Sequence, residues 1–144
     1  MNAAQLQTKI AVLRSNLAGL DRIPQASLTE FESDFRNLPA ALHLLQVAIQ
    51  TLMDLAGYAC ARRGLGAPGS SQEILEKLEG AGLVPPGTHQ RFTGMFAFRN
   101  RVVHLYDRID VQRVFDILTR ERRDLEELLS LVLRVLKDAP GGPP

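Results

Sequence analysis

The sequence predicts an all-α fold, an up-and-down bundle of four to five main helices with short extra ones. Apolar residues recur at steps of three and four in several long segments, and no segment alternates apolar and polar residues as a half-buried strand does. Glycine- and proline-rich stretches separate these segments. With 144 residues, 45% of them hydrophobic and 23% charged, the chain suits a single domain with a substantial core.

The first two helices are marked by apolar stripes and by helix-start signals. The first should be about 18 residues long, end near Gly19 and Pro24, and bury Leu6, Ile10, Leu13, Leu17 and Leu20. A second, short helix should open at Ser27 or Thr29, because each is followed three residues later by a glutamate, as in a capping box. Pro39 interrupts that pattern, and Asn37 is placed to cap a new helix.

A long helix is predicted from about Pro39 to Arg63. It is apolar around most of its circumference, so it should be buried on more than one side, at the centre of the bundle or between a bundle face and a second copy. Asp54 lies within this apolar run, and a buried carboxylate needs a partner. Asp54 could pair with Arg99 or orient His104, or it could lie on a solvated strip.

The second half of the chain should contain three further helices. Ser70 with Glu73 forms a capping box for a short helix, and the segment 85–88 starts the next one. Asp110 should cap the last helix, which is about 27 residues long. We expect a single domain over residues 1–138 and a flexible tail over 139–144, where proline and glycine dominate.

Several classes of protein are disfavoured by composition. No apolar run approaches the roughly 18–20 residues of a membrane span, and the N-terminus lacks a secretory pattern, so we expect no membrane association. The only cysteine, Cys60, cannot form an internal disulfide, which fits the cytoplasm. There is no Cys/His metal spacing and no glycine-rich phosphate loop, so we expect neither metal nor cofactor.

Positive charge is concentrated in one region. Residues 91–123 contain eight arginines and four acidic residues, a net charge of +4, whereas residues 1–90 carry −1 and residues 124–144 carry −2. Such a region would attract a phosphate-rich ligand. A solvated helix surface with ion pairs to neighbouring carboxylates would explain the same composition.

The strongest chemical signal is the stretch RNRVVHLY, from Arg99 to Tyr106. Histidine can accept and donate a proton near neutral pH, and arginine offers a planar fork that fits phosphate oxygens. His104 and Arg99 together suit metal-free phosphodiester cleavage, with Asn100 and Arg101 positioning the substrate. Asn100 and His104 are four residues apart and share a helix face, but Arg99 and His104 do not on an ideal helix. A histidine at a helix end can equally be a solvated cap.

The same stretch resembles the Arg-x4-His-x-Tyr signature of the HepT-like branch of the HEPN superfamily. The resemblance extends over residues 6–137 and includes the long helix 42–60, the connection 68–85, Phe98-Arg99-Asn100, and Ile109-Asp110. Two positions depart from the family pattern. Ala97 stands where the family often has glycine, and Leu105 stands where it often has glutamate.

The resemblance implies a ribonuclease toxin that cleaves cellular RNA, with tRNA as the expected substrate. It also implies a homodimer that brings two motifs into one cleft, and a partner, an MntA-like nucleotidyltransferase antitoxin. Tyr106 matches the tyrosine to which that partner attaches AMP. The alternative is a non-catalytic HEPN binding module that dimerises and holds a nucleotidyltransferase or a nucleotide.

Overall fold

The structure is a computed structural model that describes the backbone of residues 1–105 and 109–138 and the side chains of residues 1–102 and 109–138. Within these ranges it contains helices and no strands. The elements are α1 (Ala3–Asp21), α2 (Leu28–Glu32), α3 (Asn37–Arg62), α4 (Ser71–Gly80), α5 (Thr88–Leu105), α6 (Val111–Asp116), the π-helical segment η2 (Ile117–Glu121) and α7 (Arg122–Lys137).

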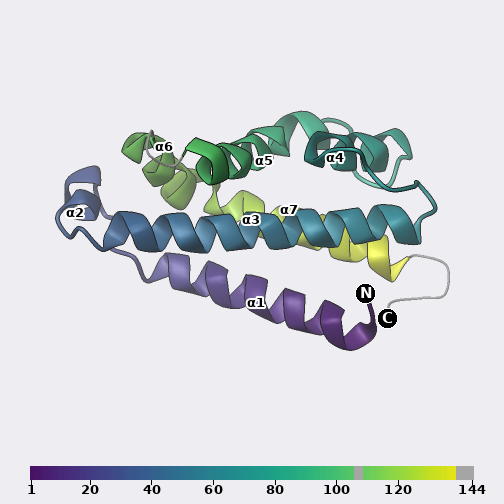
Figure 1. Cartoon of the computed structure of the whole chain (residues 1–144), viewed down its shortest axis with the longest axis horizontal. Coiled ribbons are helices and arrows are strands. Elements are labelled where there is room, and N and C mark those ends of the chain that lie inside the picture. The colour runs from purple at the N-terminus through teal and green to yellow at the C-terminus, as the bar shows by residue number, and fades with distance from the viewer. Residues whose placement is uncertain (106–108, 139–144) are drawn as a thin grey trace.

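The long helices run alternately up and down, and α3 lies at the centre of the bundle (Figure 1). Helix α3 contacts α1, α4, α5 and α7, while α2 and α6 close one end. The predicted all-α bundle is therefore confirmed. Because α5 runs toward that end and α7 runs back from it, the last residues of α5 lie near the closed end of the bundle (Figure 1).

Helix α3 is covered from within the chain. Twelve of its 26 residues are buried, and among them Leu45, Ile49, Leu52 and Leu55 are completely inaccessible. Among the residues whose side chains are described, the exposed large apolar side chains are Met1, Val12 and Phe35, and none of them belongs to α3. The other helices of the same chain thus cover much of the apolar circumference of α3, while Leu42, Leu44 and Tyr58 are only partly buried. The homodimer stays a prediction.

The composition of α3 also corrects the expectation about membrane spans. Among the described helices, α3 alone is long and apolar enough to cross a bilayer by length and composition. The sequence analysis missed this because it looked for an uninterrupted apolar run, whereas isolated polar residues leave the mean hydropathy of a long helix high. The same helix is the core of the bundle, and 44% of the candidate window is buried.

The helix-start predictions were partly right. Ser27 accepts a hydrogen bond from the backbone N–H of Glu30, and Asp110 accepts one from Gln112. Ser70 precedes α4 but makes no side-chain cap bond, because Glu73 instead accepts from the backbone N–H of Gly69. The prediction that the side chain of Ser70 caps α4 is therefore wrong.

Asn37 is not a cap either. It is the first residue of α3, it is buried, and its side-chain amide donates to the backbone oxygen of Phe31 at 3.1 Å. This bond satisfies a carbonyl at the end of α2 and fixes the sharp passage between α2 and α3. An asparagine between two predicted helices looks the same in sequence whether its side chain caps the following helix or binds back to the preceding one.

The last helical stretch has the predicted length but is not uniform. It runs from Val111 to Lys137 and changes to π-helical geometry between Ile117 and Glu121. A π segment inserts extra backbone into a helix and rotates the side chains that follow it. Ile117 and Leu118 are buried within this segment, so packing fixes the rotation of α7 relative to α6.

The start of α5 is held by the end of α4. A carboxylate oxygen of Glu79 accepts a hydrogen bond from the backbone N–H of His89 at 2.8 Å. Backbone N–H groups of His89 and Gly87 lower the pKa of Glu79 below its ordinary value. The carboxylate thereby satisfies donors that the first turn of α5 would otherwise leave open, and Gly87 permits the tight approach with its φ of 92°.

We expect Glu79→Ala to lower the melting temperature at pH 7, because the N-terminal donors of α5 lose a charged acceptor. A carboxyl group whose pKa is lowered by folding stabilises the folded state above its unfolded pKa, and the contribution is lost as the pH falls. The difference between parent and variant should therefore shrink as the pH falls below the ordinary pKa of a glutamate side chain. Thermal melts by circular dichroism across pH 3–8 measure this, with Glu32→Ala, which removes an exposed glutamate of α2, as the control.

Candidate active site on helix α5

The rotation of α5 is fixed by its apolar side. Phe92 and Phe96 are completely buried, and Met95, Phe98 and Val102 are nearly so. These side chains pack in the layer between α5 and its neighbours α3 and α4. At about 100° per residue, position 99 falls within the same arc as positions 92, 95 and 102. The sequence therefore turns Arg99 toward the interior rather than toward open solvent.

Arg99 is held in this position with part of its guanidinium unsatisfied. Its Nη1 donates to the side-chain oxygen of Asn100 at 3.3 Å. Its Nε is buried and has no hydrogen-bond partner among the described residues. A buried donor without an acceptor costs about 1–3 kcal/mol. No carboxylate among the described side chains pairs with Arg99, so the guanidinium keeps donors for an anion.

Asn100 connects this arginine to α4. Its side-chain amide nitrogen donates to the hydroxyl oxygen of Ser71 at 3.1 Å, while its oxygen accepts from Arg99. Two turns earlier, the hydroxyl of Thr93 donates to the side chain of Gln72. These side-chain bonds attach one edge of α5 to the first turn of α4. Asn100 therefore orients Arg99 from a fixed support.

Ser71 is a site residue that the sequence analysis missed. It follows the helix start at Ser70, and nothing in the local pattern distinguishes the two serines. Only the packing of α4 against α5 brings Ser71 to Asn100, which is 29 residues away along the chain. A side-chain contact of this range has no local sequence signal.

Ser71 also lines a groove of about 420 Å³ between α3 and the start of α4. The polar residues of this groove are Gln50, Asp54, Ser70 and Ser71. The structure places Asp54 with Lys9, at 3.1 Å, and with Gln50, at 2.8 Å, and not with Arg99. Asp54 is partly exposed, so it lies on the solvated strip that the sequence analysis held open.

The remaining predicted site residues are Arg101, His104 and Tyr106. Arg101 is exposed, and on a helix it points away from Arg99. The backbone of α5 continues through His104 and ends at Leu105, so His104 lies in the last turn. Its side chain lies outside the described residues, and so does Tyr106 as a whole.

Both explanations of the arginine-rich region hold in part. Three of its arginines make ion pairs with carboxylates: Arg91, Arg113 and Arg122. Four others have no carboxylate partner among the described side chains: Arg99, Arg101, Arg120 and Arg123. The region thus contains structural ion pairs and also uncompensated positive charge around the motif.

The described residues contain no group of three or more histidine, cysteine or acidic side chains that could hold a metal ion.

Cys60 is buried, and burial raises the pKa of its thiol. Cys60 is thus a small core residue, as predicted.

A helical bundle whose α5 presents an uncompensated arginine, with a histidine in its last turn, has the arrangement of a HEPN protein. The family model described as "Ribonuclease HepT-like" matches residues 13–132. The chain therefore belongs to the HepT-like ribonuclease family and is a HepT-like toxin of the HEPN superfamily. The predicted enzyme class, an endoribonuclease, is confirmed.

Two curated relatives are similar over most of the chain. A tRNA nuclease HepT from Aphanizomenon flos-aquae is 24% identical over 76% of this chain and 75% of its own length. An mRNA nuclease HepT from Shewanella oneidensis is 21% identical over 86% of this chain and 92% of its own length.

Solved structures show the same fold. One is a tri-AMPylated Shewanella oneidensis HEPN toxin in complex with MNT antitoxin, with a TM-score of 0.80, 21% identity, and coverage of 92% of this chain and 98% of that one. Another is a toxin–antitoxin complex with AMP-PNP, with a TM-score of 0.79, 20% identity, and coverage of 92% and 99%.

If Asn100 orients Arg99 from α4, removal of the Ser71 hydroxyl should slow RNA cleavage without unfolding the protein. We expect Ser71→Ala to lower kcat by roughly three- to tenfold, since one net hydrogen bond contributes about 1 kcal/mol. Ser71→Thr keeps the hydroxyl and should retain most of the activity. Equal loss in both variants, or a fall in melting temperature that matches the loss of rate, would contradict the positioning role.

Proposed function

We propose that this protein is a metal-independent ribonuclease toxin in which Arg99 and His104 carry the reaction. The observation that carries the proposal is the guanidinium of Arg99, which is oriented by Asn100, has no carboxylate partner among the described side chains, and keeps a buried N–H free. Structural arginines are normally paired or solvated. An arginine with no carboxylate partner is suited to a phosphate group that arrives with the substrate.

In this reaction His104 takes the proton from a ribose 2′-OH. The 2′-oxygen attacks the adjacent phosphorus, and the bond from phosphorus to the 5′-oxygen of the next nucleotide breaks. The products are a 2′,3′-cyclic phosphate and a 5′-OH, whose proton comes from a protonated histidine acting as the acid. Arg99 stabilises the charge that develops on the non-bridging oxygens in the transition state. Asn100 orients Arg99, and Arg101 contacts phosphates further from the reacting bond.

The proposal includes a shared cleft in a homodimer. One copy provides one His104, whereas the reaction needs a base and an acid. Two copies that bring their motifs together would divide these roles between two histidines. Since much of α3 is covered within each chain, the contact would involve the surface around the end of α5.

The biological setting follows from the relatives. Similar proteins are described as tRNA and mRNA nucleases, and similar structures as complexes of a toxin with an antitoxin. We propose that this chain cleaves cellular RNA in the cytoplasm, with tRNA as the first substrate to test. An MntA-like nucleotidyltransferase would be its antitoxin and would attach AMP to Tyr106. A bulky anion two residues from His104 would repel RNA phosphates from the cleft.

The competing proposal is a non-catalytic binding module. It is favoured by Leu105, which removes a carboxylate that the family often has beside the histidine. Such a module would hold a nucleotidyltransferase or a nucleotide and would cleave nothing. The two proposals differ in what happens to RNA in the absence of metal.

We expect Arg99→Ala and His104→Ala each to lower RNA cleavage in EDTA by at least about 100-fold, because each removes a group needed in the transition state. Arg36→Ala is the control, since it removes an exposed arginine far along the chain from the motif. Gel filtration and circular dichroism must show that the variants keep the parent's assembly and helicity. A parent protein that leaves RNA intact while its Tyr106 carries no AMP would favour the binding module.

We expect Tyr106→Phe to remain toxic when the nucleotidyltransferase is co-expressed, because the acceptor hydroxyl is gone. The parent should instead be neutralised and should gain the mass of AMP on the peptide that contains Tyr106. Colony counts and mass spectrometry measure the two effects. Neutralisation of Tyr106→Phe as complete as that of the parent would contradict the role of Tyr106.

A further inference from the structure

A second positively charged surface lies on α7. Three arginines, Arg120, Arg123 and Arg134, have no hydrogen bond or ion pair among the described residues, and Arg123 and Arg134 are exposed. Their spacing of three and eleven residues places them along one side of the η2–α7 stretch. Between Arg123 and Arg134 the helix rises about 16 Å. We call these three residues the α7 arginine stripe.

The acidic residues beside the stripe form ion pairs with other arginines. Arg91 of α5 pairs with Asp124 at 2.6 Å and with Glu127 at 2.5 Å. Arg122 pairs with Glu126 at 3.2 Å and with Asp21 at 2.8 Å. These two arginines meet four carboxylates, so the three arginines of the stripe leave this surface with a net charge of +1. An external anion would meet Arg120, Arg123 and Arg134 without displacing an ion pair.

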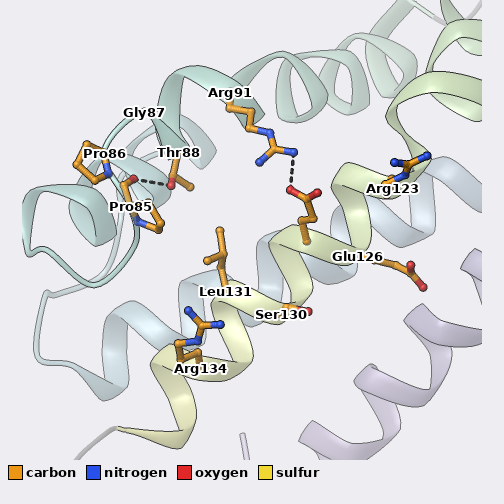
Figure 2. Close-up of a pocket in the computed structure, with 11 residues that line it drawn as sticks. Pro85, Pro86, Gly87, Thr88, Arg91, Arg123, Glu126, Ser130, Leu131 and Arg134 are labelled. Carbon is orange, nitrogen blue, oxygen red and sulfur yellow. Dashed lines mark hydrogen bonds and ion pairs between the residues drawn. The ribbon is translucent and has the colours of Figure 1, made fainter.

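A cleft of about 480 Å³ accompanies the stripe. It lies between α7 and the segment that leads into α5, and its volume falls in the range of small-molecule sites. Figure 2 shows Arg91 facing α7 from α5, and Arg123 and Arg134 at opposite ends of the α7 part of the cleft. Pro85, Pro86 and Leu131 provide apolar lining, and Ser130 provides a hydroxyl between the two arginines. Glu127, paired with Arg91, and Glu126, paired with Arg122, also line the cleft.

The approach to this cleft is rigid. The hydroxyl of Thr88 donates to the backbone oxygen of Pro85 at 2.6 Å, and Thr88 is buried (Figure 2). The two prolines restrict the backbone of this segment further. The apolar side chains of Pro85, Pro86 and Leu131 can contact the face of a nucleobase, while the arginines beside them suit the phosphates on either side of it.

We propose that the α7 arginine stripe is an RNA-binding exosite, where single-stranded RNA is held at a distance from the reacting motif. The inference rests on the proposed function for the identity of the polymer. RNA is favoured over an acidic protein because three arginines without ion pairs lie along an extended line, with a cleft between two of them that Pro85, Pro86 and Leu131 line in part. Since α7 runs back from the end of the bundle where α5 ends, one RNA strand can reach both surfaces (Figure 1).

The test is the binding of a fluorescent single-stranded RNA, measured by anisotropy in the double variant Arg123→Gln/Arg134→Gln. The measurement uses the His104→Ala background in EDTA so that the RNA stays intact. The matched control is Arg22→Gln/Arg36→Gln, which removes the same charge from arginines outside the cleft. Melting temperatures of all proteins verify folding.

The stripe variant should bind RNA roughly 20-fold more weakly than the control at 0.1 M salt. The slope of log K against log salt should be smaller by about 1.4, since each phosphate contact of a single strand contributes about 0.7. Equal affinity and equal slope in the two double variants would overturn the proposal. Unchanged RNA binding with weaker binding of a poly-glutamate peptide would also overturn it and assign the surface to an acidic protein.

The outcome of the RNA-binding measurement does not depend on whether the protein cleaves RNA. RNA binding is measured with a variant that lacks His104, so the outcome stands whether or not the parent cleaves RNA. A parent that cleaves RNA while the stripe variant binds it normally would contradict the exosite alone. A parent that binds RNA through the stripe without cleaving it would contradict the catalytic proposal alone.

Discussion

The need to cover the apolar surface of α3 organises this molecule. A helix that is apolar around most of its circumference must be packed on several sides, and here α1, α4, α5 and α7 pack against it within one chain. Each covering helix has to turn its own apolar stripe toward α3, which fixes its rotation as well as its place. For α5 this rotation decides the chemistry. The turn of helix that buries Phe96 and Phe98 also carries Arg99 into a partly enclosed position, where one of its donors is left without a partner.

Apolar packing fixes the rotation of α5, and polar contacts then fix the orientation of individual side chains on this helix. The amide of Asn100 is attached to Ser71 of α4 and holds the guanidinium of Arg99 from the other side. Helix α4 also holds the start of α5, where Glu79 of α4 satisfies the first backbone donors. Helix α4 is short, but it fixes α5 at both the beginning and the motif. This explains how a bundle of ordinary composition can present a charged side chain at a defined orientation.

Much of this could be predicted from sequence because helical periodicity is local. The stripe from Leu6 to Leu20, the cap at Asp110 and the length of the last helical stretch all follow from residues close in the chain. What failed depends on which of several nearby partners a polar side chain binds, or on contacts between helices. Asn37 binds backward to Phe31, Glu73 binds Gly69 rather than forming a box with Ser70, and Ser71 meets Asn100 only through packing. The π-helical segment within the last helical stretch also has no periodic signal, because it shifts the phase of an otherwise regular stripe.

The account places all of the chemistry in the side chains of Arg99 and His104, so the most direct measurement is the chemistry of the RNA ends after cleavage in EDTA. An oligonucleotide that carries a single 2′-deoxyribose at the mapped cleavage position provides the sharpest form of this test. The account predicts 2′,3′-cyclic phosphate and 5′-OH ends from the all-ribose substrate, and no cleavage at the substituted position. Ends with 5′-phosphate, cleavage at the 2′-deoxy position, or a strict requirement for Mg²⁺ would contradict it.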